Sequence, residues 1–160
     1  HCDRVKMANI AQLINVLQAV ILTDGPRMLR TPTYHVFHMY KYHQDADLVE
    51  SYLDGVETIG EEKEYMVPSL QESVSVDKEG ILTITLNNLS VDKNEPVEIS
   101  FAECQTKEVT AAILNNEMHA YNTFEDPDKV HEEVFSNYTV ENGMIRFTMP
   151  ASSVVQFRVR

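Results

Sequence analysis

From about residue 44 onward, apolar residues recur at every second position in several short runs, and this alternation restricts the fold more than any other feature. Successive side chains of an extended strand point to opposite faces, so an alternating run predicts a strand with one face toward a core. The runs lie at residues 73–76, 82–87, 97–101, 145–149 and 155–160. We therefore predict that this part of the chain is mainly β.

Turn signals between the runs support this prediction. Residues 77–80, Asp-Lys-Glu-Gly, separate two of the runs. Asn142-Gly143 is a strong hairpin signal, because both central residues of a type I′ turn need a positive φ. Many short strands with regular turns are typical of an antiparallel β-sandwich or jelly roll. We find no internal repeat that would favour another β architecture.

The first 43 residues have a different pattern. A dense apolar run covers residues 5–22, and periodicity alone leaves open whether it is a buried strand or a buried helix. The run ends at Asp-Gly-Pro, residues 24–26, which predicts a turn. We expect residues 1–43 to form a short α-helical or βα segment and residues 44–160 to form the sandwich domain.

A helix is predicted to begin at Thr31-Pro32 and to fade near residue 43. Threonine is a favourable N-cap, and proline at the first helical position loses no needed hydrogen bond. Val36, Phe37 and Tyr40 recur at three- and four-residue spacing, so we expect them to form its apolar face.

Composition excludes some classes of function. The formal net charge of −12 argues against nucleic-acid binding, which requires clustered Lys and Arg. No stretch approaches the roughly 18 apolar residues of a membrane span, so we expect no membrane partner. The start has no signal-peptide pattern and no Met, and we expect it to be an interior position of a longer protein. Cys2 and Cys104, the two cysteines, are predicted to be free buried thiols.

Two pairs of segments resemble family fifty-one α-L-arabinofuranosidases. The first pair is DRVKMANIAQLINV at residues 3–16 and TPTYHVF at residues 31–37. The second pair is AYNTFEDPDKV at residues 120–130 and MPASSVV at residues 149–155. Their order and spacing match the family over nearly the whole chain, and residues 47–65 resemble it least.

The resemblance implies a (β/α)₈ barrel followed by a β-sandwich. Residues 5–12 would then be the last barrel strand and residues 31–43 the last barrel helix. The active site of such a barrel lies at the carboxyl ends of its strands. The glutamine of the Ala-Gln-Leu motif is Gln12, which by resemblance contacts the arabinose in the intact enzyme. The alternative for Gln12 is a polar residue that ends a strand or faces solvent, and we assign no role to Asn9 or Asn15.

No catalytic residue is predicted in this chain. Family members are retaining glycosidases, which need an acid/base Glu and a nucleophile Glu about 5–5.5 Å apart. By resemblance both would precede His1, and the nucleophile motif contains a Trp, which this chain lacks. We expect surface turns at the Asn-Glu pairs of residues 94–95 and 116–117. The chain alone is therefore predicted to be inactive, with no cofactor.

Other candidate sites have a simpler interpretation. His35 and His38 could share a helix face, but no carboxylate lies at matching spacing and the family uses no metal. Asp126-Pro127-Asp128 predicts a turn whose Asp side chains bond the local backbone.

Three functions remain open at this point. The first is an accessory domain that packs on and stabilises the barrel or the oligomer of an enzyme releasing terminal arabinofuranosyl groups from polysaccharides or oligosaccharides. The second is a stand-alone carbohydrate-binding module, which would need Tyr121 or Tyr138 as a sugar platform. The third is an interaction domain of a homo-oligomer, because exposed apolar residues in 13–22 would drive self-association or pack in a new way. The family suggests a cytoplasmic compartment.

Overall fold

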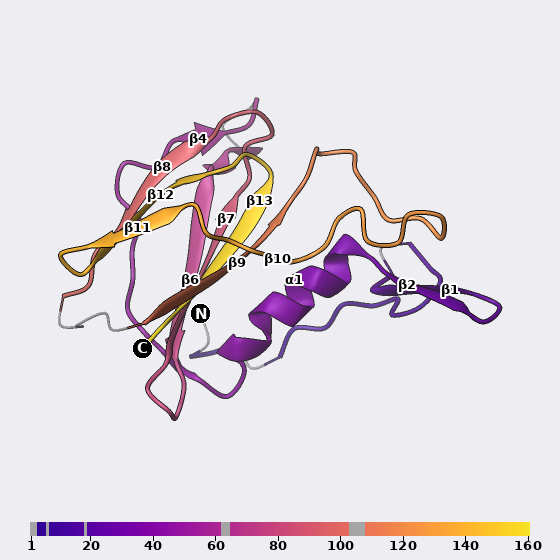
Figure 1. Ribbon diagram of the computed structural model, residues 1–160, viewed down its shortest axis with the longest axis horizontal. Helices are drawn as coiled ribbons and strands as arrows, with labels where there is room; N and C mark the ends of the chain where they lie inside the picture. Colours follow the sequence, from indigo (N-terminus) through magenta and orange to yellow (C-terminus); the bar gives the residue numbers. More distant parts are fainter. Residues whose placement is uncertain (1–2, 6, 18, 62–64, 103–107) are drawn as a thin grey trace.

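Two antiparallel sheets stacked face to face form the body of the protein (Figure 1). The computed structural model describes residues 3–5, 7–17, 19–61, 65–102 and 108–160. The larger sheet has the order β10-β9-β13-β7-β6-β3. Its strands are β3 (Asp47–Leu48), β6 (Leu70–Val76), β7 (Leu82–Asn88), β9 (Val109–Asn115), β10 (Glu133–Val134) and β13 (Ser153–Val159). The smaller sheet contains β11 (Tyr138–Glu141), β12 (Met144–Met149) and β8 (Glu95–Ile99), in that order.

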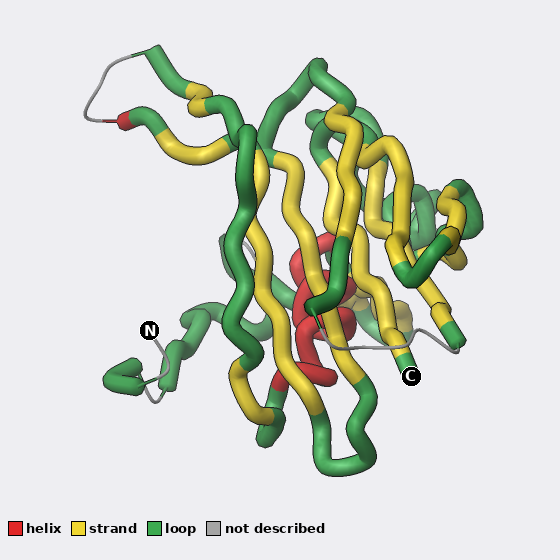
Figure 2. Tube along the Cα trace, turned by 90° about the vertical axis from the view of Figure 1, so that its left-hand side faces the viewer, coloured by secondary structure: helices red, strands yellow, loops and turns green. Residues whose placement is uncertain are grey.

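The remaining elements lie around the sandwich. Two small hairpins pair β1 (Ile21–Asp24) with β2 (Arg27–Arg30) and β4 (Thr58–Ile59) with β5 (Val67–Pro68). A helix, α1 (Pro32–Tyr40), continues into a 3₁₀ turn, η1 (Lys41–His43). Figure 2 shows α1 against one face of the large sheet. The prediction of a mainly β, antiparallel fold with a short helical segment before it is confirmed.

The main hydrophobic core fills the space between the two sheets. The residues that alternate in the sequence supply most of it, and they come from β6, β7, β12 and β13. Phe157 and Ile145 are both fully buried there. The strand predictions are confirmed in β6, β7, β8, β12 and β13. The sequence analysis did not predict β9, because alanine and threonine in Val-Thr-Ala-Ala-Ile-Leu-Asn weaken its alternation.

The two turns predicted between the alternating runs, at residues 77–80 and 142–143, are both formed. Asn142 and Gly143 have φ angles of 52° and 76°, and the flanking residues Glu141 and Met144 are paired. At residues 77–80, the Asp77 carboxylate accepts the backbone N–H groups of Glu79 and Ile81. These local bonds fix the β6–β7 connection and with it the register of two central strands.

The central strands are buried on both faces, which differs from the half-buried expectation. On the face turned away from the core, Thr83, Thr85 and Gln156 are at most 3% exposed. The reason is that α1 and η1 lie on this face. Fully buried Met39 of α1 packs there in a second, smaller core with Leu114 and Val130.

Polar side chains of the sheet hold the helix in place. The Gln156 amide donates to the Met39 carbonyl (2.6 Å) and to Thr85 Oγ1 (3.0 Å). His43 bonds Ser75 Oγ and Thr85 Oγ1, both at 2.8 Å. Residues 32–43 therefore share a core with the sandwich. The domain boundary at residue 44 stays a prediction.

The structure of α1 differs from the prediction in its N-cap and in its buried face. Thr31 occupies the N-cap position with an extended backbone, but its hydroxyl makes no cap and donates instead to the carbonyls of Ala19 and Val20. The predicted apolar face is wrong for Phe37, which is 50% exposed, whereas His35 and Met39 are buried. The sheet that receives the helix is polar at its centre, so apolar spacing does not set which helix face is buried.

In this chain by itself, the described residues of 5–12 form no strand, and their place in a barrel stays a prediction. These residues are exposed, and strand begins only at Ile21. A parallel barrel strand needs neighbouring strands to pair its backbone groups, and the described chain supplies none for this segment. The predicted turn at residues 24–26 is confirmed as the β1–β2 connection. Cys2 and Cys104 lie outside the described residues.

Candidate functional site

Gln12, the residue predicted to contact a sugar, lies exposed in the segment before β1. Its φ is 69°, a left-handed conformation that is uncommon for residues other than glycine. Among the described residues its side chain has no hydrogen-bond partner. Strained backbone of this kind is more frequent at functional sites than elsewhere, and an unpaired exposed amide is free to bind a ligand.

The backbone beside Gln12 is fixed by a closed loop. The Leu13 carbonyl accepts the N–H groups of Val20 and Ile21, both at 3.1 Å. Asn15 has a φ of 55°, and its side chain donates to Thr23 Oγ1 (2.8 Å) and accepts the Thr23 N–H (2.7 Å). Asn15 thus ties the loop to β1, a positioning role that the sequence analysis did not assign. Asparagine tolerates the left-handed conformation, which is the signal that was available.

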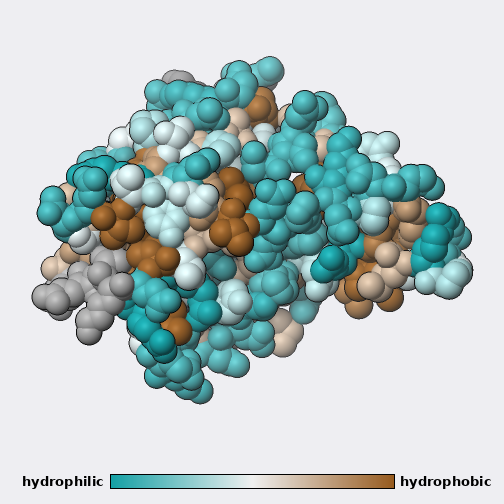
Figure 3. All heavy atoms as spheres, viewed as in Figure 1, coloured by the Kyte–Doolittle hydropathy of each residue, from teal (hydrophilic) through white to brown (hydrophobic). Residues whose placement is uncertain are grey.

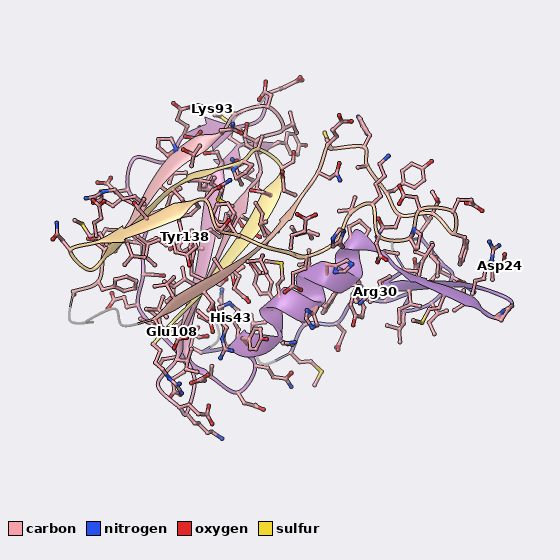
Figure 4. The ribbon with its side chains drawn as sticks, viewed as in Figure 1. Asp24, Arg30, His43, Lys93, Glu108 and Tyr138 are labelled. Carbon is pink, nitrogen blue, oxygen red and sulfur yellow. The ribbon has the colours of Figure 1, made fainter. Side chains whose placement is uncertain are left out.

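A second group of functional side chains surrounds the start of α1. We call it the α1 hollow, a surface hollow of about 460 Å³ between the end of β2, α1 and the segment before β10. Figure 4 shows Arg30 at the junction of β2 and α1. The lining residues are Arg30, Tyr34, His35, His38, Asp128, His131 and Glu132. The sequence analysis missed this site because its two halves are about a hundred residues apart.

Asn122 brings the two halves together. Its amide group donates to the carbonyls of Arg30 and Val130, both at 2.8 Å, and its oxygen accepts the Val130 N–H at 2.7 Å. Asn122 is only 6% exposed, so these bonds are shielded from water. One side chain therefore fastens the 122–130 loop to the end of β2.

Hydrogen bonds fix the protonation pattern on one side of the hollow. The Lys41 ammonium donates to His38 Nε2 (2.7 Å), so His38 Nδ1 carries the proton that is shared with Glu132 (2.6 Å). The Tyr34 ring stacks on the His38 ring at a centroid distance of 6.1 Å, and the Arg30 guanidinium lies 5.5 Å from the Tyr34 centroid.

His35 also lines the hollow, and one of its ring nitrogens has no hydrogen-bond partner among the described residues. The residue is 4% exposed, and its Nδ1 accepts the Glu132 N–H (3.4 Å). His35 Nε2 is buried and has no hydrogen-bond partner among the described residues. Burial, and then the positive charge of Arg30, lower the pKa of His35 below its usual value of 6.5, so the ring is neutral near neutral pH. Within the described part of the chain, no three His, Cys, Asp or Glu side chains are arranged to bind a metal ion.

Tyr138, one of the two candidate sugar platforms, faces the core. Its hydroxyl donates to the Val109 carbonyl (2.9 Å), and its ring packs edge-on against Phe157 at 5.3 Å. Tyr121 is 67% exposed and therefore accessible.

The two Asn-Glu pairs make local contacts. Asn94 accepts the Ala151 N–H, and Glu95 begins β8, where it pairs with Lys93, instead of lying in the expected turn. Asn116 lies in a loop, as expected, where it donates to the Lys129 carbonyl.

The Asp-Pro-Asp turn at residues 126–128 is present. The prediction that its Asp side chains bond the local backbone is not met. The Asp126 N–H is instead bonded by Thr123 Oγ1, and the Asp128 carboxylate pairs with Arg30 (3.4 Å). The Asp128 side chain therefore belongs to the α1 hollow.

Comparison with known proteins gives a consistent set of relatives. The profile of the α-L-arabinofuranosidase C-terminal domain family matches residues 1–153. An intracellular exo-α-L-arabinofuranosidase of Bacteroides ovatus is 35% identical over the whole chain. The crystal structure of a family fifty-one arabinofuranosidase from Xanthomonas axonopodis superposes with a TM-score of 0.92 at 35% identity, covering 100% of this chain and 32% of that one.

A Thermotoga maritima α-L-arabinofuranosidase, solved as an arabinose complex, superposes with a TM-score of 0.84 at 27% identity, over 99% of this chain and 34% of that one. The chain spans 31% of the length of the Bacteroides enzyme. In the described residues no helix is long and apolar enough to cross a membrane.

Proposed function

The chain belongs to the α-L-arabinofuranosidase C-terminal domain family, and we propose that it serves as the non-catalytic part of such an enzyme, packed on a catalytic barrel that the rest of the enzyme supplies. In this proposal the sandwich and α1 form a rigid support. The segment before β1 completes the barrel with its last strand.

The observation that carries this proposal is the exposure of apolar side chains before β1. Leu13, Ile14 and Leu17 are 60%, 50% and 85% exposed, and Met7 is 77% exposed. Burying one such side chain stabilises a protein by about 1.5–3 kcal/mol. Figure 3 shows apolar residues gathered near the β1–β2 end of the molecule. Several exposed apolar side chains along one segment fit a protein partner.

Gln12 would contact the arabinofuranosyl group in the intact enzyme. An amide both donates and accepts hydrogen bonds, which suits sugar hydroxyls. The catalytic acid/base and nucleophile carboxylates would come from other barrel strands, and the reaction would proceed by double displacement with retention. The substrate class is terminal arabinofuranosyl groups on polysaccharides or oligosaccharides.

The proposal also includes a homo-oligomer. Apolar side chains that the barrel leaves uncovered would pack against another copy of the chain. Without the barrel, the exposed segment before β1 would itself drive association, and analytical ultracentrifugation of the chain and of a Leu13→Ser/Leu17→Ser variant tests this. We expect the parent chain to self-associate and the variant to do so less.

Hydrolysis of para-nitrophenyl α-L-arabinofuranoside tests the proposal. We expect no turnover by the 160-residue chain and clear turnover by the longer protein that contains it. In the longer protein, Gln12→Ala should lower kcat/KM by about tenfold or more, because a substrate hydrogen bond is lost. Turnover by the short chain, or an unchanged kcat/KM in the variant, would refute the assignment of the catalytic groups or of Gln12, respectively.

A further inference from the structure

The α1 hollow combines a built shape with an unsatisfied group, and the proposed function uses neither. Its volume of about 460 Å³ lies within the range of small-molecule sites. Three separate segments form it, and the buried Asn122 fixes two of them to each other. The hollow is therefore a defined feature of the tertiary structure and not a gap between surface side chains.

His35, which lines the hollow, holds a buried donor without a partner among the described residues. Because Nδ1 accepts the Glu132 N–H, the proton of the neutral ring lies on Nε2, which is buried without a partner among the described residues. A buried donor that loses water without gaining an acceptor destabilises a protein.

The charges in the hollow select a neutral ligand. Arg30 faces the Asp128 carboxylate at 3.4 Å, and Glu132 is engaged by His38 at 2.6 Å. Two carboxylates oppose a second anion, and the Arg30 guanidinium opposes a cation. The hollow presents the Arg30 donor and carboxylate acceptors together, which suits a ligand whose groups both donate and accept.

We propose that the α1 hollow is a saccharide-binding site that takes a neutral, hydroxyl-rich sugar unit, separate from Gln12. A sugar hydroxyl accepts from Arg30 and donates to the Asp128 or Glu132 carboxylate. The Tyr34 and His38 rings, stacked in parallel, offer a flat edge for the sugar ring. The site would hold a further unit of a branched or polymeric saccharide, and this choice of ligand rests on the proposed function.

Nuclear magnetic resonance of the 160-residue chain tests this proposal. The imidazole signals are followed while methyl α-L-arabinofuranoside and then an arabino-oligosaccharide are added to millimolar concentrations. The His35 signals are assigned from the spectrum of a His35→Phe variant. We expect a saturable shift of the His35 and His38 signals, with the exposed His119 unchanged.

A matched pair of variants separates the hollow from general effects. Arg30→Met and Lys93→Met each remove one exposed cation, with side chains 45% and 48% exposed, and the two residues lie at different ends of the molecule (Figure 4). We expect Arg30→Met to weaken binding by about fivefold to tenfold, the effect of one hydrogen bond, and Lys93→Met to leave it unchanged. Absence of a saturable His35 shift, equal effects of the two variants, or binding that maps to Tyr121 would overturn the proposal. If His35→Phe fails to fold, the signals are assigned through bonds and the Arg30 and Lys93 pair decides the outcome.

Discussion

Met39 is the side chain on which the docking of α1 depends most, and we predict that Met39→Ala destabilises the whole protein. The side chain is fully buried between the helix and the outer face of the large sheet, where it packs with Leu114 and Val130. Replacing a buried Met by Ala typically costs 2–5 kcal/mol, the lost transfer free energy plus the cavity that remains. We expect about 3 kcal/mol, because alanine favours the helix and offsets a little of the loss.

Urea unfolding measures this change in the free energy of unfolding. Circular dichroism reports the sheets, and the seven tyrosines give a fluorescence signal in a chain without Trp. For a domain of this size, about 3 kcal/mol corresponds to a fall in Tm of roughly 6–12 °C. Phe37→Ala on the same helix is the matched control, because Phe37 is 50% exposed, and we expect it to cost less than about 1 kcal/mol.

The comparison of Met39→Ala with Phe37→Ala tests whether α1 packs on the sheet. A Met39→Ala cost no larger than that of Phe37→Ala would mean that α1 does not pack on the sheet in this chain. A change in the denaturant slope m without a change in midpoint would point to loss of the helix alone, and the shared core argued above would then be wrong.

Three further predictions follow from the same structure. The pKa values of His35 and His43 are both lowered from 6.5, in each case chiefly by burial, so between these lowered values and pH 6.5 the unfolded chain binds protons that the folded chain does not. The free energy of unfolding should therefore be fully retained above about pH 6.5 and fall as the pH drops below it. The slope is at most about 1.4 kcal/mol per pH unit for each histidine. Urea midpoints at several pH values measure this, and a slope that His43→Gln leaves unchanged would exclude His43 as a contributor. Asn122→Ala should lower the free energy of unfolding by about 1–3 kcal/mol, because it leaves the buried Val130 N–H and two carbonyls unpaired. It should also broaden the His38 imidazole signals. A Tm equal to that of the parent would contradict the proposed role of Asn122 in holding the loop. Asn142→Ala should cost about 1 kcal/mol, because alanine tolerates the φ of 52° less well than asparagine, and an unchanged Tm would argue against the type I′ turn.

Residues with a local physical signal are the ones that the sequence predicts well. Alternation in β7 and β13 and the Asn142-Gly143 turn each depend on the chain's own geometry, so strand positions and the β11–β12 hairpin were predictable. Pro32 marks the start of α1 for the same reason. The position of Gln12 was predictable only as a motif, since its left-handed φ and its unpaired side chain depend on the loop closed by Leu13 and Asn15.

The features that failed in the sequence analysis depend on partners distant in sequence. Thr83, Thr85 and Gln156 look like the solvent face of an amphipathic sheet, but they are buried because α1 arrives there from another part of the chain. Residues 5–12 are a barrel strand only by resemblance, and a parallel strand exists only with neighbours that complete its hydrogen bonds.

The sequence by itself determined that the chain is a mainly β, antiparallel domain with a short helix before it, because side-chain period and turn chemistry are local properties. Only the tertiary structure decided which face of α1 is buried, that His35 holds an unpaired nitrogen, and that Arg30 and Glu132 line one hollow. These features require residues about a hundred positions apart to meet, and no periodicity in the sequence records such a meeting. The physical reason is that packing and hydrogen-bond satisfaction depend on contacts between elements, whereas side-chain period and turn chemistry depend on neighbouring residues.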